Sequence, residues 1–334
     1  MVTICVDAMG GDSGSEVVLE GIAQALEADS ELQVLVAGSD ALVTPFCEQH
    51  ERALPLVTSE VIEMGDHPAE SVRAKKDSSI VRGCKAIREG QADGFFSAGN
   101  TGAIMVAATM NVGRLKGIKR PALATAIPGA SGRRSVMIDM GANADATEEM
   151  IVQFAHMGRA YAKVTLGVAQ PKVALLSNGE EEAKGSERAI AYHKALAAAS
   201  DGWFVGNGEG TDVLAGRFDV LVCDGFTGNV SLKTLEGTAK FIVSRIKDAT
   251  KKSKRAALGA LLLKPALKAV AAELSGDEYG GAVLLGLKSP VIIGHGATSA
   301  LAVKNGTLVC AQAVRENLVD KIAEGIASTV EDGE

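Results

Sequence analysis

Short runs of apolar and β-branched residues recur along the chain, and each run ends in a polar, glycine-rich corner. Runs that are apolar throughout are typical of strands buried on both faces, which indicates a parallel or mostly parallel sheet. Helical patterns separate several of the runs, and alternating strands and helices predict an α/β sandwich. The predicted strands lie at 3–8, 92–96, 135–139, 173–176, 203–206, 220–223 and 291–294, and two clear predicted helices lie at 15–28 and 147–162.

Glycine is abundant, with 38 glycines and only 8 prolines in 334 residues. The glycine-rich corners follow the carboxyl ends of the predicted strands, which is where open α/β sheets bind their ligands. Glycine at such a corner lets the backbone turn tightly or come close to a ligand. We therefore expect the corners to surround one binding site.

Several common cofactor and catalytic motifs are absent from the sequence. The first corner, Asp7–Asp12, is not a GxGxxG turn with an acidic ribose partner, and no Walker A motif occurs, so dinucleotide and nucleotide triphosphate binding are poorly supported. No GxSxG motif supports a serine hydrolase. The five cysteines contain no C-x-x-C pair and the five histidines no metal-ligand spacing, so we expect neither a metal site nor a disulfide framework.

The expected location is the cytoplasm. Residues 1–8 lack the basic and long apolar regions of a signal peptide, and no uninterrupted apolar stretch reaches the length of a membrane-spanning helix. The formal charge of −7 argues against nucleic acid as the main partner.

Residues 232–275 depart from the alternating pattern, because they have little strand character and many helix formers. Within them, the stretch 240–268 holds nine basic residues and one acid, which is a charge of +8. Because the whole chain has a charge of −7, the residues outside this stretch carry −15. An apolar cluster at 258–263 follows the basic residues, and Pro265 interrupts the helical pattern. We interpret 232–275 as an inserted, basic, amphipathic helical excursion.

Two corners contain residues that could bind an anion. In SAGNTGA (97–103), backbone N–H groups at a helix start could hold an anion, although a tight turn without a ligand explains the pattern equally well. In NGEEEAKG (178–185), Lys184 could be held by carboxylates and aimed at an anion, whereas a solvated acidic loop is the simpler interpretation. The basic run Arg73, Lys75 and Lys76 could likewise bind phosphate or form a charged loop.

The corner DGFTGNVSLK (224–233) is the most unusual of the set. Thr227 and Asn229 alternate with glycines before a helix that is predicted to begin near Ser231. An asparagine amide and backbone N–H groups in such a position could form an oxyanion hole.

Together these motifs resemble one known family. Their order and spacing, over essentially the whole chain, are similar to those of the bacterial acyl-[acyl-carrier-protein]:phosphate acyltransferases of phospholipid synthesis. The resemblance rests on DAMGGD (7–12), RAKKDSS (73–79), SAGNTGA (97–103), RPAL (120–123), DMGAN (139–143), NGEEEAKG (178–185), DVLVCDGFTGNVSLKTLEG (219–237), YGGAVLLGL (279–287) and HGA (295–297).

The resemblance implies a three-layer αβα sandwich of the isopropylmalate-dehydrogenase/phosphotransacetylase type with a protruding helical hairpin. It implies one α/β domain over 1–334, or two lobes on a shared sheet, and a homodimer. The implied reaction moves a long fatty acyl group from acyl carrier protein to inorganic phosphate, by direct attack on the thioester and without a covalent acyl-enzyme, a metal or another cofactor. A membrane glycerol-3-phosphate acyltransferase would then consume the acyl phosphate.

The resemblance also suggests roles for individual residues. Lys184 is expected to neutralise phosphate or the oxyanion, and Asn229 to donate to the oxyanion. Residues expected to bind phosphate or substrate are Asp7, Gly10, Gly11, Asp12, Arg73, Asn100, Thr101, Gly102, Asn143, Asp224, Thr227 and Gly228. Residues expected to contact the membrane or the carrier protein are Arg255, Leu258, Leu261, Leu262, Leu263 and Lys264.

The basic excursion with its apolar tip suits the surface of an anionic bilayer, so we expect peripheral association with the cytoplasmic membrane. It also suits the acidic carrier protein. A dimerisation hairpin is the alternative, and the functions can be shared between different parts of the excursion.

Three other functions fit less well. An NAD-dependent decarboxylating dehydrogenase of the same fold would need metal-binding aspartates and an arginine cluster, and the sequence has no such constellation. A short-chain phosphotransacetylase does not explain residues 232–275. A membrane-associated scaffold that organises lipid synthesis does not explain the polar corners at several strand ends.

Overall fold

The computed structural model of the protein describes residues 1–251, 253, 255, 258–265 and 277–331. The strands are β1 (Val2–Asp7), β2 (Leu32–Gly38), β3 (Ala53–Val57), β4 (Gly94–Ser97), β5 (Ala122–Pro128), β6 (Arg134–Ile138), β7 (Val173–Leu176), β8 (Phe204–Gly208), β9 (Val220–Val222), β10 (Ala282–Leu285) and β11 (Val291–Ile293). The helices are α1 (Ser15–Ala28), α2 (Asp40–Gln49), α3 (Pro68–Ala74), α4 (Ser79–Arg88), α5 (Thr101–Asn111), α6 (Glu148–Leu166), α7 (Glu187–Ala198), α8 (Gly225–Thr250), α10 (Ala300–Arg315) and α11 (Leu318–Glu331).

The strands of the described chain form one eleven-stranded sheet in the order β3-β2-β1-β4-β11-β10-β5-β6-β9-β7-β8. The strands from β3 to β11 are mutually parallel, and so are those from β6 to β8. Between these blocks, β10 is antiparallel to both β11 and β5, and β5 is antiparallel to β6. The two parallel blocks therefore point in opposite directions, and the corners that follow their strands form two groups rather than one.

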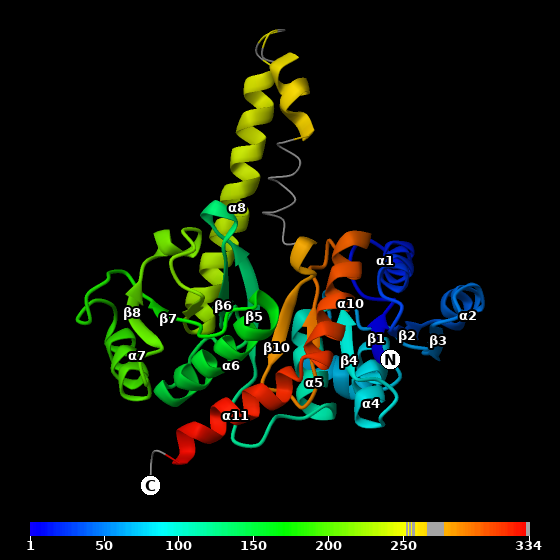
Figure 1. The fold of residues 1–334 in the computed structure, drawn as a ribbon. Helices are drawn as coiled ribbons and strands as arrows, with labels where there is room; N and C mark the ends of the chain where they lie inside the picture. The colour runs from blue at the N-terminus through cyan, green and yellow to red at the C-terminus, as the bar shows by residue number, and fades with distance from the viewer. Residues whose placement is uncertain (252, 254, 256–257, 266–276, 332–334) are drawn as a thin grey trace.

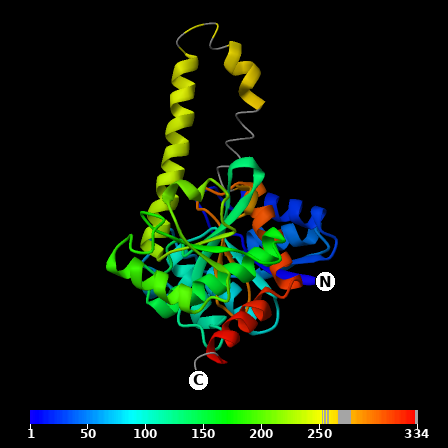
Figure 2. The ribbon, with the colours of Figure 1, turned by 60° about the vertical axis from the view of Figure 1, so that its left-hand side comes forward.

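Helices cover both faces of the sheet, so the predicted α/β sandwich is confirmed as three layers (Figures 1 and 2). One hydrophobic cluster joins the sheet to α1, α2, α6, α7, α10 and α11. A second cluster joins the opposite face to α3, α4 and α5, and the half-buried Leu232 and Leu235 of α8 pack against it. β5 shows the alternation that makes this possible, since Ala122 and Ala124 belong to the first cluster and Leu123 and Ile127 to the second.

The helix that follows β9 starts earlier than the sequence predicts. α8 begins at Gly225 rather than near Ser231, because the Asp224 carboxylate accepts the Thr227 N–H at 2.7 Å and so caps the helix. Glycines lower intrinsic helix propensity, and close contacts of Gly225 and Gly228 with the body override that preference here. Asn229 consequently lies in a helical turn and not in a loop.

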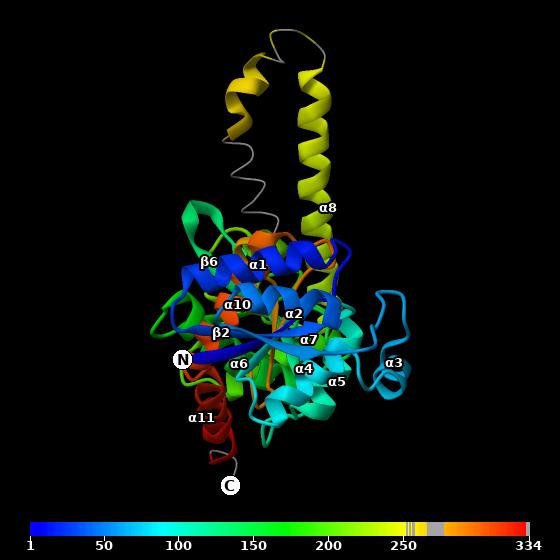
Figure 3. The ribbon, with the colours of Figure 1, turned by 90° about the vertical axis from the view of Figure 1, so that its right-hand side faces the viewer.

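Beyond its first turns, α8 projects from the sandwich, and with the helical residues 258–265 it forms an arm (Figures 1 and 3). The arm exposes apolar side chains, including Phe241, Ile242, Leu258, Leu261, Leu262 and Leu263. Of the predicted excursion over 232–275, residues 252, 254, 256–257 and 266–275 lie outside the described residues. Within the described ranges, no helix combines the length and the apolar character needed to cross a bilayer.

Candidate active site

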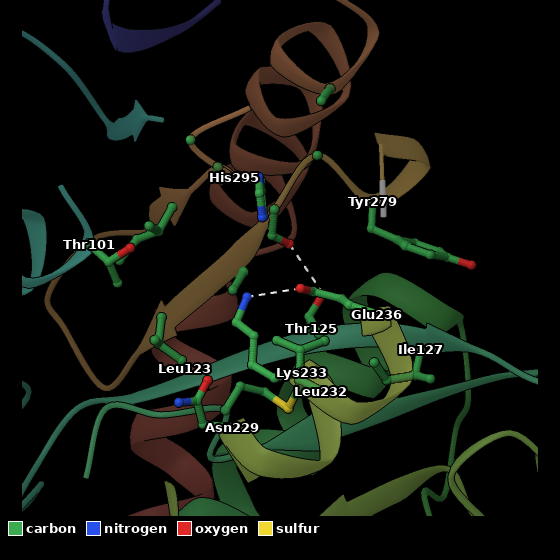
Figure 4. Close-up of a pocket in the computed structure, with 18 of the residues that line it drawn as sticks. Thr101, Leu123, Thr125, Ile127, Asn229, Leu232, Lys233, Glu236, Tyr279 and His295 are labelled. Atoms are coloured by element: carbon green, nitrogen blue, oxygen red, sulfur yellow. Dashed lines mark hydrogen bonds and ion pairs between the residues drawn. The ribbon is translucent and has the colours of Figure 1, made fainter. Parts of the chain in front are cut away.

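A groove with a volume of about 420 Å³ lies between the first turns of α8 and the central strands β5, β10 and β11. The side chains of Leu123, Thr125 and Ile127, which alternate along one face of β5, lie along its floor (Figure 4). Leu232 and Leu235 of α8 line it as well. The groove is therefore built on β5, a strand that the apolar-run pattern does not predict.

Residues from both groups of corners reach this groove. Asp12, Thr101 and His295 follow β1, β4 and β11 of one parallel block, and Asn229 follows β9 of the other. Figure 4 shows Thr101 and Asn229 toward one end, and Ile127 and Tyr279 toward the other. Although the two blocks point in opposite directions, the groove that crosses the central strands collects residues from both.

Two charged residues that the sequence analysis did not select also line the groove. Lys233 and Glu236 lie on the same face of α8 as Asn229, and the Lys233 ammonium donates to the Glu236 carboxylate at 2.9 Å (Figure 4). Lys233 supplies the only lysine or arginine among the described residues that line the groove. The i, i+4 spacing of Asn229 and Lys233 identifies Lys233 as a neighbour of Asn229 only if the helix is predicted to start before Asn229.

The opposite face of α8 borders a second cavity, with a volume of about 380 Å³. Thr227 and Ser231 of α8 line this cavity with the capping residue Asp224, and Ser177 after β7 and Ser186 before α7 line it as well. Thr227 and Asn229, which are two residues apart, therefore face different cavities, as residues two apart on a helix do not share a face. The structure does not bring Thr227 and Asn229 into one site.

A buried carboxylate fixes the loop against which α8 begins. Asp139 Oδ1 accepts the N–H groups of Leu123, Gly141 and Ala142 at 3.0–3.2 Å, and Oδ2 accepts the Asn143 N–H at 2.7 Å and side-chain amide at 2.9 Å. Burial raises the pKa of Asp139, and these hydrogen bonds act in the opposite direction. Asn143 also donates to the Pro121 carbonyl at 2.9 Å, so its amide nitrogen stabilises this loop.

Asp7 plays a similar part in the first corner. It is buried, and it accepts the Ser97 hydroxyl at 2.7 Å and the Met9 N–H at 2.9 Å. Burial raises the pKa of this carboxyl group. A Cβ on Gly10 would lie 2.6 Å from Asp7 Oδ2, so glycine is needed there for a close approach.

The Asn100 side chain is fully engaged inside the protein. Its Oδ1 accepts the Ala103 N–H at 3.0 Å and caps α5, while its Nδ2 donates to the carbonyl oxygens of Met64 at 3.0 Å and Asp66 at 3.1 Å. Thr101, the first residue of α5, is exposed in the groove, and N–H groups in the first turn of a helix have no intrahelical partners. Asn100 therefore positions the start of α5, and Thr101 is the residue of that first turn that lines the groove.

Two of the acidic side chains around Lys184 face other parts of the chain. The Glu180 carboxylate pairs with Arg217 at 2.8 Å, and the Glu182 carboxylate lies 3.9 Å from His193 Nε2. The Lys184 stem packs over Gly179, where a Cβ would lie 2.7 Å from its Cγ. Lys184 lines neither the groove nor the second cavity.

The predicted site residues consequently fall into four groups. Asp12, Thr101 and Asn229 line the groove, and Asp224 and Thr227 line the second cavity. Close packing or internal hydrogen bonds occupy Asp7, Gly10, Gly11, Asn100, Gly102, Asn143 and Gly228. Lys184 and the exposed Arg73 of α3 line neither cavity. Within the described chain, no three His, Cys, Asp or Glu side chains are grouped as metal ligands.

This arrangement defines the class of protein as an α/β protein with the phosphotransacetylase fold. A phosphotransacetylase from Streptococcus pyogenes superposes with a TM-score of 0.63 over 94% of each chain, at 16% identity. A branched-chain phosphotransacylase from Enterococcus faecalis superposes with a TM-score of 0.60 over 94% of this chain and 99% of that one, also at 16% identity. At such identities the likeness concerns the fold alone.

The sequence comparisons are more specific. The family described as fatty acid synthesis protein matches residues 2–321. A phosphate acyltransferase from Limosilactobacillus reuteri is 45% identical over 98% of this chain and 96% of its own length, and one from Heliobacterium modesticaldum is 43% identical over 98% of each chain. The chain belongs to this family of phosphate acyltransferases and is a transferase enzyme.

Proposed function

We propose that the protein transfers a long-chain fatty acyl group from acyl carrier protein to inorganic phosphate and releases acyl phosphate for phospholipid synthesis. The observation that carries this proposal is the composition of the groove, where Thr101 and Asn229 lie toward one end, Lys233 lies one helical turn beyond Asn229, and the apolar Leu123 and Ile127 flank Thr125 along β5. An acyl thioester has the same division, with one polar reacting group and a long apolar chain.

The proposed reaction needs no covalent acyl-enzyme. A phosphate oxygen attacks the thioester carbonyl carbon, the carbon–sulfur bond breaks as the tetrahedral intermediate collapses, and the carrier thiolate leaves and takes a proton from solvent. The Asn229 amide donates to the oxyanion of that intermediate. Thr101 at the start of α5 and the Lys233 ammonium hold phosphate beside the carbonyl carbon.

Lys184 and Lys233 are the two candidates for the cation that balances this negative charge. Lys233 lines the groove one turn after Asn229, whereas Lys184 lies in a loop outside the groove. The geometry supports Lys233 as the cation nearest the reacting atoms. A role for Lys184 is proposed from the family resemblance. That role requires movement of the 178–185 loop or contact of the loop with the carrier protein.

The surface of α8 supports further proposals about the partners and the location of the protein. Phe226 and Val230 expose an apolar face at its base, with 67% and 49% of their surfaces accessible, and this supports a homodimer contact. The basic arm supports binding of the acidic carrier protein. Its exposed leucines support peripheral binding to the cytoplasmic membrane, close to the glycerol-3-phosphate acyltransferase that would consume the product.

The decisive assay incubates the protein with palmitoyl-carrier protein and phosphate and measures acyl phosphate. Asn229→Ala should lower kcat by about 10²–10³-fold, the usual effect of losing one oxyanion donor. Lys233→Ala should raise the KM for phosphate by about tenfold or more, while Lys194→Ala, an exposed lysine of α7, serves as the matched control. Lys184→Ala tests the alternative cation in the same assay.

The alternatives have their own outcomes in that assay. Formation of acetyl phosphate from acetyl-CoA with no use of palmitoyl-carrier protein would favour a short-chain phosphotransacetylase. NAD-dependent turnover would favour a dehydrogenase. A folded protein that forms no acyl phosphate from either donor would contradict the proposal.

A further inference from the structure

The groove changes in character along its length. From Leu123 to Ile127 the floor strand spans about 13 Å, at about 3.3 Å per residue. Leu235 follows Asn229 by six residues, which corresponds to about 9 Å along the α8 axis. In Figure 4 the strand and the helix run in the same general direction, so the groove extends along both from Asn229 toward Ile127.

Apolar side chains form most of the distal half of the groove. Ile127 of β5 is buried, Leu235 of α8 is half-buried, and both belong to or pack against one hydrophobic cluster. Tyr279 lies at this end with its ring under the Arg134 guanidinium, 5.1 Å from carbon to ring centroid. An apolar ligand that entered past Asn229 would pass the Lys233–Glu236 ion pair and would reach Leu235, Ile127 and this stacked pair beyond it.

We propose that the distal half of the groove binds the acyl chain of the substrate, and that Leu235, Ile127 and Tyr279 limit its length. This inference rests on the proposed function, because the acyl donor supplies the apolar ligand. A linear aliphatic chain fits a long site with a strand floor and leucines on the facing helix. The alternative ligand for the same space is the pantetheine arm of the carrier protein, which carries an amide every few atoms and is identical for all acyl donors.

The two candidate ligands predict different effects of acyl chain length on kcat/KM in the variants. This difference is the basis of the test. Leu235→Trp would fill the distal half of the groove, and Ile127→Ala would enlarge it. Thr238→Trp is the matched control, because Thr238 is an exposed residue of the same helix that does not line the groove. The measurement is kcat/KM with octanoyl- and hexadecanoyl-carrier protein for each purified variant.

If the acyl chain occupies the distal half, Leu235→Trp should lower kcat/KM for the hexadecanoyl donor by about tenfold or more, and should change the octanoyl value by less than about threefold. Ile127→Ala should shift the preference toward the longer donor, and Thr238→Trp should leave the ratio unchanged. An equal loss for both donors with Leu235→Trp would indicate the pantetheine arm and overturn the proposal. Unchanged values for both donors would overturn it too.

A binding measurement separates this proposal from the proposed function. Calorimetric titration with palmitate requires no catalysis. If the wild-type protein forms no acyl phosphate, the proposed function is wrong, yet binding of palmitate that Leu235→Trp weakens by about tenfold would still support an acyl site in the groove. Equal palmitate binding by the wild type, Leu235→Trp and Thr238→Trp would contradict the acyl site whatever the enzyme activity.

Discussion

A Cβ atom on Gly228 would lie 1.9 Å from the carbonyl oxygen of Asp139. The first turn of α8 therefore touches the end of β6 directly, with no side chain between the two backbones. The next residue, Asn229, has its Cβ 3.3 Å from the Cβ position at Gly141 in the same loop. This contact fixes how far the proposed oxyanion donor reaches into the groove.

Gly228→Ala should push α8 away from β6, because a methyl group cannot fit at that distance. We expect the free energy of unfolding to fall by about 2 kcal/mol and acyl transfer to fall with it. Urea denaturation measures the first effect. The matched control is Gly237→Ala in the same helix, where no atom lies within 4 Å of the added Cβ, and it should stabilise the protein by about 0.5–1 kcal/mol. Equal stability changes for the two variants would refute the contact.

Asp139→Asn should destabilise the loop that supports Asn229. The amide can keep the three bonds to Oδ1, but its nitrogen would face the two donors of Asn143 that now bind Oδ2. We expect a loss of about 3 kcal/mol in the free energy of unfolding, together with reduced kcat. Asp320→Asn, on the exposed first turn of α11, should change the stability by less than about 1 kcal/mol. If Asp139→Asn were as stable as the wild type, the hydrogen bonds accepted by Asp139 would contribute little to the free energy of unfolding.

His156 of α6 should make the stability depend on pH. Burial lowers the pKa of His156 to about 4 from 6.5, with a contribution from Arg159, while Asp201 acts in the opposite direction. Between these values the unfolded chain binds a proton that the folded chain does not, so the free energy of unfolding falls as the pH falls from about 6.5 to about 4. The full loss from this one group is about 3 kcal/mol.

The variant His156→Phe isolates that contribution, because it keeps an aromatic ring against Trp203, whose centroid is 5.1 Å away. Denaturation at several pH values between 7 and 4 should give a flatter profile for this variant than for the wild type. His67→Phe, at an exposed position, should keep the wild-type profile. A His156→Phe profile that parallels the wild type would contradict the assignment.

The tip of the arm provides a test of membrane association. Leu261 and Leu262 are 65% and 75% exposed, so replacing both with glutamate should leave the fold intact. We expect the double variant to sediment less with phosphatidylglycerol vesicles, since it loses apolar insertion and gains negative charge, while its activity in solution is retained. Leu54→Glu, on the exposed part of β3, is the matched control for adding a charge. Undiminished vesicle binding by the double variant would refute the tip hypothesis.

Several elements could be predicted from local pattern alone. Thr147 caps α6 by accepting the Met150 N–H, as the Thr-Glu-Glu start indicates, and α1 spans the predicted residues 15–28. The apolar runs locate β7 and β9, because a strand buried on both faces leaves a mark within a few residues. β5 escapes this pattern, since alanines and Thr125 interrupt its larger apolar residues.

The sequence predicts the candidate site less completely, because local patterns do not show which way a side chain points. The glycine-rich corners predict Asn229 and Thr101 as site residues, and both line the groove. The sequence pattern does not predict Lys233, because Lys233 shares a helix face with Asn229 only if α8 starts before Asn229, at Gly225. The carboxylates near Lys184 pair with or bond to distant residues such as Arg217, and no pattern within 178–185 contains that information.

The sequence alone determined the alternation of strands and helices, the glycine-rich corners, the basic arm and the family. These depend on residues close together in the chain or on the order of motifs along it. The tertiary structure decided that β5 and β10 separate two oppositely directed blocks, and that one groove across them collects Thr101, Asn229 and Lys233. The direction of a strand and the face of a helix follow from packing against distant segments, so only the folded chain could place these side chains together.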